Sequence, residues 1–205
     1  MKYIKKIPVA DKETKRILMA EGWIKLKEPT NLKIATLLSI PFMIINTIIF
    51  IGITIVIYPL SEEFLNIISD FKITLNINFT VIVYISSIIL FTIIHEFIHA
   101  CFIPNFLKSN KTYWGINRGF GFVYTTEKIK RWRYIIISIM PFIILSIIFP
   151  ILVNRLGILN KFILFLCLVN AMGSSVDSLN IWIILRRVPK GATIINNGFE
   201  TYYRK

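Results

Sequence analysis

The chain has 205 residues, of which 55% are hydrophobic, and its mean hydropathy is +0.67. This apolar content is typical of an integral membrane protein and excludes an ordinary soluble domain. The net charge of +13 could indicate nucleic-acid binding, but no nucleic-acid-binding motif accompanies it. Because the cations lie next to apolar segments, we expect contact with anionic lipid headgroups and no nucleic-acid partner.

The N-terminal segment is polar and rich in lysine over about thirty residues, which does not fit a cleavable signal peptide. Within it, residues 11–23 predict a short helix at the membrane interface. Trp23 would then lie at the depth of the headgroups.

Four apolar stretches reach the roughly 20 residues that a 30 Å hydrocarbon core requires. They cover residues 32–58, 79–107, 134–153 and 161–185. The sequence therefore predicts an all-α integral membrane protein with four transmembrane helices, in which residues 1–205 form a single membrane-embedded domain.

Basic residues predict the orientation of these helices. The 24 Lys and Arg residues divide as nine from Lys2 to Lys33, one in the first connection, seven from Lys108 to Arg133, two at Arg155 and Lys161, and five after Leu185. Cytoplasmic segments carry the excess of Lys and Arg in membrane proteins. Both termini and the middle connection are therefore expected in the cytoplasm.

The cytoplasmic connection between the second and third spans contains a predicted hairpin. Residues 116–125 combine Asn and Gly turn signals with aromatic and β-branched residues, which indicates a short β-hairpin or strand. Its edge could align an extended peptide, with Phe120 and Phe122 in contact with the substrate. A folded-back loop anchored by Tyr113 and Trp114 fits the pattern equally well.

A second alternating stretch, residues 71–79, predicts a strand at the outer surface. We assign it no function.

The second span contains the only two histidines of the chain, His95 and His99, with Glu96 directly after the first. A spacing of four residues places both imidazoles on one face of a helix, where they can bind a single zinc ion. Glu96 then lies where a base that activates water is needed. Two histidines and a glutamate inside a membrane are unfavourable unless they have partners, so a functional site is the better interpretation.

A catalytic zinc ion usually has three protein ligands, and Asp177 is the candidate for the third. It is the only carboxylate in the predicted spans besides Glu96. His99 and Asp177 each lie eight residues before the predicted cytoplasmic end of a span, about 12 Å deep. Their matched depth predicts that they can meet.

Asp177 shares a polar helix face with Asn170, Gly173, Ser174 and Asn180. Such a stripe is also typical of a packing seam between membrane helices. We expect both roles, with Gly173 and Ser174 allowing a close approach of helices and Asp177 binding metal. Asn170 is a candidate for a hydrogen bond to the substrate or the reaction intermediate.

The paired motifs HEFIHA at residues 95–100 and GSSVD at residues 173–177 resemble the small bacterial membrane family of putative zincin peptidases. That family is similar in turn to the site-2 proteases, which cut substrates within the membrane. In site-2 proteases the later motif typically reads Asn-Pro-x-Pro-x-Asp-Gly, and its aspartate is the third zinc ligand, a role that Asp177 matches. The prolines and the last glycine are absent here, so the chain is closer to the small peptidases. The resemblance covers residues 79–185 and implies a Zn²⁺ cofactor and a bacterial plasma membrane.

These observations together predict an intramembrane zinc metallopeptidase that hydrolyses peptide bonds of a membrane protein or peptide. His95, His99 and Asp177 would hold the zinc, and Glu96 would be the general base. The alternative is a non-enzymatic metal-binding carrier, sensor or scaffold of the membrane. A carrier would have no need of Glu96 beside the first ligand. No feature of the sequence indicates an oligomeric state.

Overall fold

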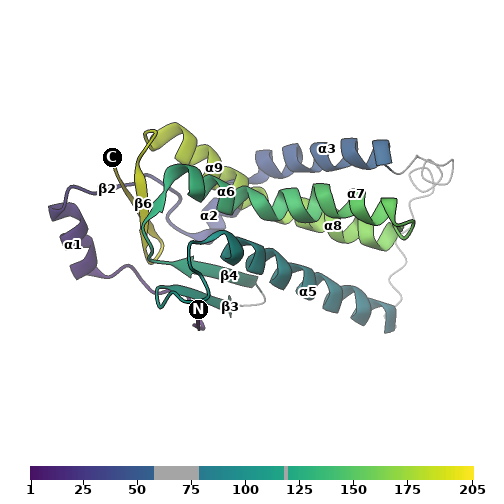
Figure 1. The fold of residues 1–205 in the computed structure, drawn as a ribbon, viewed down its shortest axis with the longest axis horizontal. Coiled ribbons are helices and arrows are strands. Elements are labelled where there is room, and N and C mark those ends of the chain that lie inside the picture. The colour runs from purple at the N-terminus through teal and green to yellow at the C-terminus, as the bar shows by residue number, and fades with distance from the viewer. Residues whose placement is uncertain (58–78, 118–119) are drawn as a thin grey trace.

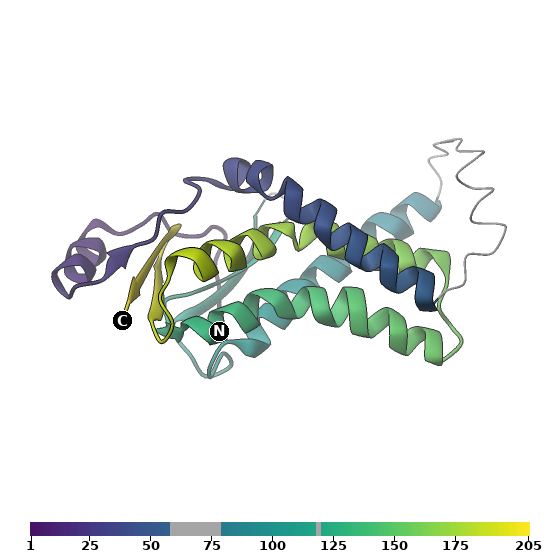
Figure 2. The same cartoon turned by 90° about the horizontal axis from the view of Figure 1, so that it is seen from above.

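Helices dominate the computed structural model, which describes residues 1–57, 79–117 and 120–205 (Figure 1). Within these residues, four helical stretches are long and apolar enough to cross a membrane. They are Ile40–Ile57, Val81–Phe102, Arg131–Arg155 and Lys161–Arg187. Both termini and the β-strands lie at one end of these helices (Figures 1 and 2). The prediction of four helices of membrane-spanning length and composition is confirmed.

Helix α3 (Ile40–Ile57) shows why these segments suit a bilayer. Most of its residues are apolar, and Ile44, Ile48 and Val56 are all more than half exposed. Water would penalise such a surface, whereas lipid accommodates it.

The first and second spans are shorter than predicted. Residues Leu32–Leu38 form a separate helix, α2, and α3 begins only after a break at Ser39. Helix α5 (Phe79–Phe102) stops five residues early because Pro104 follows, and the residue before a proline is disfavoured in a helix. The strand predicted for residues 71–79 lies outside the described residues, except for Phe79, where α5 begins.

The third and fourth spans are both interrupted. The third consists of α6 (Arg131–Phe142), the π-helical segment η1 (Ile143–Ile148) and α7 (Phe149–Arg155). The fourth consists of α8 (Lys161–Gly173) and α9 (Ser175–Arg187). Pro141 precedes the π-helical segment, and Ser174 separates α8 from α9. The π-helical segment contains Ser146, and the break at Ser174 is followed by Asp177 in the first turn of α9.

The predicted hairpin is present and belongs to a three-stranded sheet. Strand β3 (Thr112–Asn117) pairs antiparallel with β4 (Phe120–Thr125), and β1 (Lys2–Tyr3) adds in parallel to β3. The order β1-β3-β4 leaves β4 at one edge. Strand β4 packs against α5 (Figure 1).

A second sheet makes the all-α prediction wrong. Its strands are β2 (Ile24–Lys25), β5 (Ile129–Lys130), β6 (Thr193–Asn197) and β7 (Glu200–Arg204), in the order β2-β7-β6-β5. Leu26, Ala192 and Ile194 of this layer are buried against Ile184 of α9, which fixes the sheet to the end of the fourth span. The pairing partners are up to about 180 residues apart, so no local pattern reveals them.

Helix α1 (Lys12–Ala20) forms where a helix was expected, with Asp11 accepting a hydrogen bond from the Thr14 amide at its N-terminus. The depth of Trp23 at the headgroups stays a prediction, but its ring is covered by protein. Trp23 is 3% exposed and packs with Leu18 and Tyr202, while the Arg204 guanidinium lies 5.0 Å from its ring centre. Figure 1 shows α1 at the far end of the sheets from the spans.

Candidate metal centre

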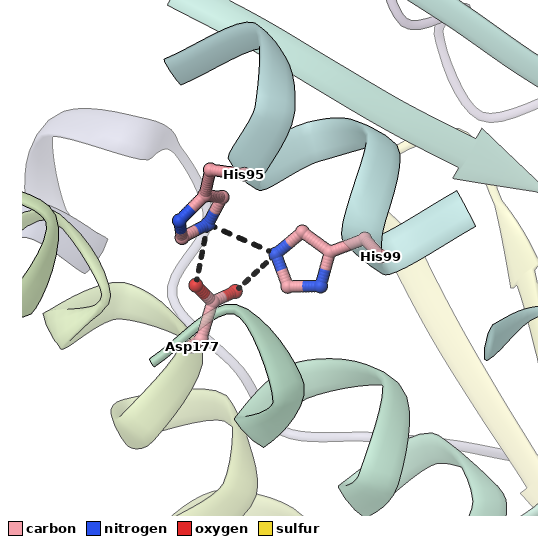
Figure 3. A group of neighbouring side chains, drawn as sticks. All are labelled: His95, His99 and Asp177. Atoms are coloured by element: carbon pink, nitrogen blue, oxygen red, sulfur yellow. Dashed lines mark hydrogen bonds and ion pairs between the residues drawn. The ribbon is translucent and has the colours of Figure 1, made fainter. Parts of the chain in front are cut away.

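Three side chains from two candidate spans converge near the C-terminal end of α5 (Figure 3). His95 and His99 project from α5, and their Nε2 atoms are 3.1 Å apart. The carboxylate of Asp177 on α9 faces both rings, with Oδ2 3.4 Å from Nε2 of His95 and Oδ1 3.5 Å from Nε2 of His99. The structure therefore brings together the three residues predicted as ligands.

A main-chain carbonyl determines the tautomer of His99. Its Nδ1 lies 2.7 Å from the carbonyl oxygen of Ile137 on α6. A carbonyl can only accept, so Nδ1 carries the proton and donates. The lone pair of Nε2 then points toward Asp177.

The tautomer of His95 follows from the orientation of one amide, that of Asn170 on α8. Asn170 Nδ2 donates to Ser146 Oγ at 2.8 Å and to the Pro141 carbonyl at 3.3 Å. This leaves Oδ1 to accept from Nδ1 of His95 at 2.8 Å. Ser146 in turn donates to the Cys167 carbonyl at 2.9 Å, so the side chains of Asn170 and Ser146 both have hydrogen-bond partners. His95 thus also presents an unprotonated Nε2.

Two imidazole lone pairs and a carboxylate facing one another repel unless a cation lies between them. Zinc binds nitrogen at about 2.0–2.1 Å in tetrahedral sites, which places adjacent ligand atoms about 3.3 Å apart. The three separations measured here lie close to that value. Because the donor set is also of the His and Asp type that zinc prefers, these residues fit a zinc ion.

The break between α8 and α9 places Asp177 in the first turn of α9. Helix α3 supports the break, because Asn46 donates through Nδ2 to the Ala171 carbonyl and to Ser178 Oγ, each at 3.1 Å. Ser174, within the break, donates to the Asn170 carbonyl at 2.9 Å. The ligand is thus held by polar contacts from a span that supplies no ligand itself.

Glu96 lies under strand β4. A Cβ atom added to Gly121 would stand 2.6 Å from Cγ of Glu96, so the strand passes over this side chain at a distance that only glycine permits. The α5 helix thus presents two ligands toward α9 and a carboxylate toward the hairpin.

Three other predicted residues have different surroundings from those expected. The amide of Asn170 is occupied by protein partners. The ring of Phe122 lies over Gly115, its partner in the ladder, on the face of the hairpin opposite to Gly121. Gly173 does not mediate close packing, since a Cβ there would meet nothing within 4 Å. Phe120 belongs to β4, and its side chain lies outside the described part of the structure.

Sequence reasoning missed Ser146, Asn46 and the Ile137 carbonyl. Asn46 could have been noticed, because an amide within an otherwise apolar span is unfavourable without a partner. Pro141 pointed to the Ile137 carbonyl, since a proline leaves the carbonyl four residues before it without its helical donor.

This membrane fold with a His, His and Asp centre is the arrangement expected of a membrane-embedded zinc metalloprotein. Residues 88–193, just over half of the chain, match the family described as "Putative zincin peptidase", and the chain belongs to this family. Membership implies a zinc cofactor, and His95, His99 and Asp177 form the group that could bind it. No match was found among curated proteins or among solved structures.

Proposed function

We propose that this chain is an intramembrane metallopeptidase that resembles the site-2 proteases and cleaves a membrane protein or peptide. The observation that carries this proposal is the convergence of His95, His99 and Asp177, with Glu96 adjacent, within segments apolar enough to span a membrane. The family supports the general class of zinc metallopeptidase. Cleavage within the membrane is our extension of that class, based on the apolar surroundings of the site.

Glu96 is proposed as the general base. Zinc bound by the three ligands would activate a water molecule and polarise the scissile carbonyl. Glu96 would accept the proton of that water and pass it to the leaving amine, as a carboxylate next to the first ligand can do. His95 and His99 keep their Nε2 lone pairs toward the centre because Asn170 and Ile137 accept from Nδ1.

Strand β4 is proposed to hold the substrate. It forms an edge of its sheet and passes directly over Glu96 at Gly121. An extended peptide that adds to this edge would be held by main-chain hydrogen bonds beside the general base. A transmembrane helix would have to unwind locally to bind in this way.

We further propose that both termini lie in the cytoplasm of a bacterial plasma membrane, from the alternating distribution of basic residues. The sheets would then lie on the cytoplasmic side. Anionic headgroups are the proposed lipid partners. We propose that one such headgroup binds in a cavity of about 380 Å³ beside the end of α9, which is lined by Lys25, Leu26, Lys27, Arg187 and Tyr203.

The test compares wild-type protein with Glu96→Gln in native membranes and in reconstituted vesicles. Fragments of a membrane protein should appear only with the wild type, and turnover should fall by about 10² to 10⁴-fold in the variant while zinc content stays the same. A carrier or sensor would tolerate the substitution. Equal cleavage by both proteins would contradict the proposal.

A further inference from the structure

Pro141 is linked to the supports of both histidines, because its carbonyl accepts from Asn170 and it lies four residues after Ile137 in α6. It is fully buried within α6. Its nitrogen has no hydrogen, and its carbonyl accepts from Asn170 Nδ2 at 3.3 Å.

The missing hydrogen matters because of its position. In an α-helix, the N–H of residue 141 would donate to the carbonyl of Ile137. That carbonyl is instead 2.7 Å from Nδ1 of His99. A residue with an N–H at position 141 would compete with His99 for the same oxygen.

We propose that Pro141 is a positioning residue for the metal centre, and that it acts by keeping the Ile137 carbonyl available to His99. The carbonyl holds the proton of His99 on Nδ1 and so directs Nε2 toward Asp177. Through its own carbonyl, Pro141 also orients Asn170, which does the same for His95. A single proline thereby sets both imidazole tautomers.

The alternative role is purely structural, because a proline inside a span also bends or loosens the helix. Pro150 provides a matched control. It is equally buried and belongs to the same span. In the part of the chain that the structure describes, no hydrogen bond joins Pro150 to a site residue.

The inference rests on metal binding by the proposed site and not on peptide hydrolysis, so its test measures metal affinity. Zinc dissociation constants are obtained by chelator competition for wild type, Pro141→Ala and Pro150→Ala. The absorption of bound Co²⁺ reports the ligand geometry. Pro141→Ala should lose about 10- to 100-fold in affinity, as expected when the partner of a ligating histidine is removed. Pro150→Ala should bind metal like the wild type.

A third variant separates the N–H from the bend. Replacing Pro141 with the α-hydroxy acid analogue of alanine removes the ring but introduces no N–H. Metal affinity and the Co²⁺ spectrum should stay near wild type in this variant, even if Pro141→Ala does not fold. Loss of affinity in the analogue, or wild-type affinity in Pro141→Ala, would overturn the inference. Failure of the wild type itself to bind zinc would instead contradict the proposed function.

Discussion

Substituting Gly121 with alanine tests how the hairpin and Glu96 work together. The new Cβ would lie 2.6 Å from Cγ of Glu96, whereas ordinary contacts begin at 3.4 Å. Either the strand or the carboxylate must therefore move by about 0.8 Å. Because Cγ is only one bond from the Cβ of Glu96, rotation of the distal carboxylate cannot relieve the contact.

The expected magnitude follows from this displacement. A misplacement of about 1 Å in catalytic geometry can reduce turnover by about 10²-fold. We expect Gly121→Ala to lower kcat/KM by about 10- to 100-fold. Zinc content should not change, because the supports of His95 and His99 lie on α6 and α8, away from the hairpin.

The assay is cleavage of the reconstituted substrate, with zinc measured on the same preparation. Gly173→Ala is the control, because its Cβ would meet nothing within 4 Å and alanine favours a helix by about 1 kcal/mol over glycine. Combining Gly121→Ala with Glu96→Gln should cost no more than Glu96→Gln alone, since both act on one step. Wild-type turnover in Gly121→Ala would refute the reasoning.

Three further predictions concern the orientation in the membrane, the second sheet and the cavity beside α9. A thiol reagent added outside intact cells should label a cysteine that replaces Asn160 but not one that replaces Lys190. The reverse result would invert the proposed orientation. Hydrogen bonds from Lys25 and Tyr202 lower the pKa of Glu200 below its ordinary 4.5, so this stabilisation is present above that pH and lost in acid. The melting temperature of Glu200→Gln should accordingly lie below wild type at neutral pH and approach it in acid, and an unchanging difference would contradict this. Replacing Lys27 and Arg187 with glutamine should weaken retention of phosphatidylglycerol but not phosphatidylcholine, whereas Lys5→Gln should have no effect; equal retention by all would exclude the cavity as a headgroup site.

The membrane helices could be predicted because hydropathy is a local property. Any segment of about 20 apolar residues faces the same physical requirement, wherever the rest of the chain lies. The hairpin at β3 and β4 was also predictable from nearby turn and strand residues. The second sheet was not, since it joins β2 to β7 across most of the sequence.

The meeting of His99 and Asp177 was expected from equal depths, but the span ends behind that estimate were inexact. Helix α5 ends three residues after His99, whereas α9 continues for ten residues after Asp177. The side chains still meet, and the remaining turns of α9 extend past the end of α5 and pack against the second sheet. Asp177 was therefore identified mainly because it is the one carboxylate besides Glu96 in the predicted spans, and less because of its estimated depth.

The contacts that orient the ligands could not be predicted from local pattern. Ser146, Asn170 and Ile137 lie on three different elements, and their roles depend on how those elements pack. Every residue has a main-chain carbonyl, so residue type does not show which one accepts from a histidine. Only the proline four residues after Ile137 marks it, and in a span that proline indicates a bend as readily as a ligand support.

X-ray absorption at the zinc edge of the purified protein tests the central claim most directly. We predict one zinc per chain with two imidazole nitrogens at about 2.0–2.1 Å, oxygen in the remaining positions and no sulfur. Asp177→Ala should lose one oxygen ligand and most of its zinc affinity. A sulfur ligand, or full zinc occupancy with an unchanged spectrum in Asp177→Ala, would contradict the centre formed by His95, His99 and Asp177.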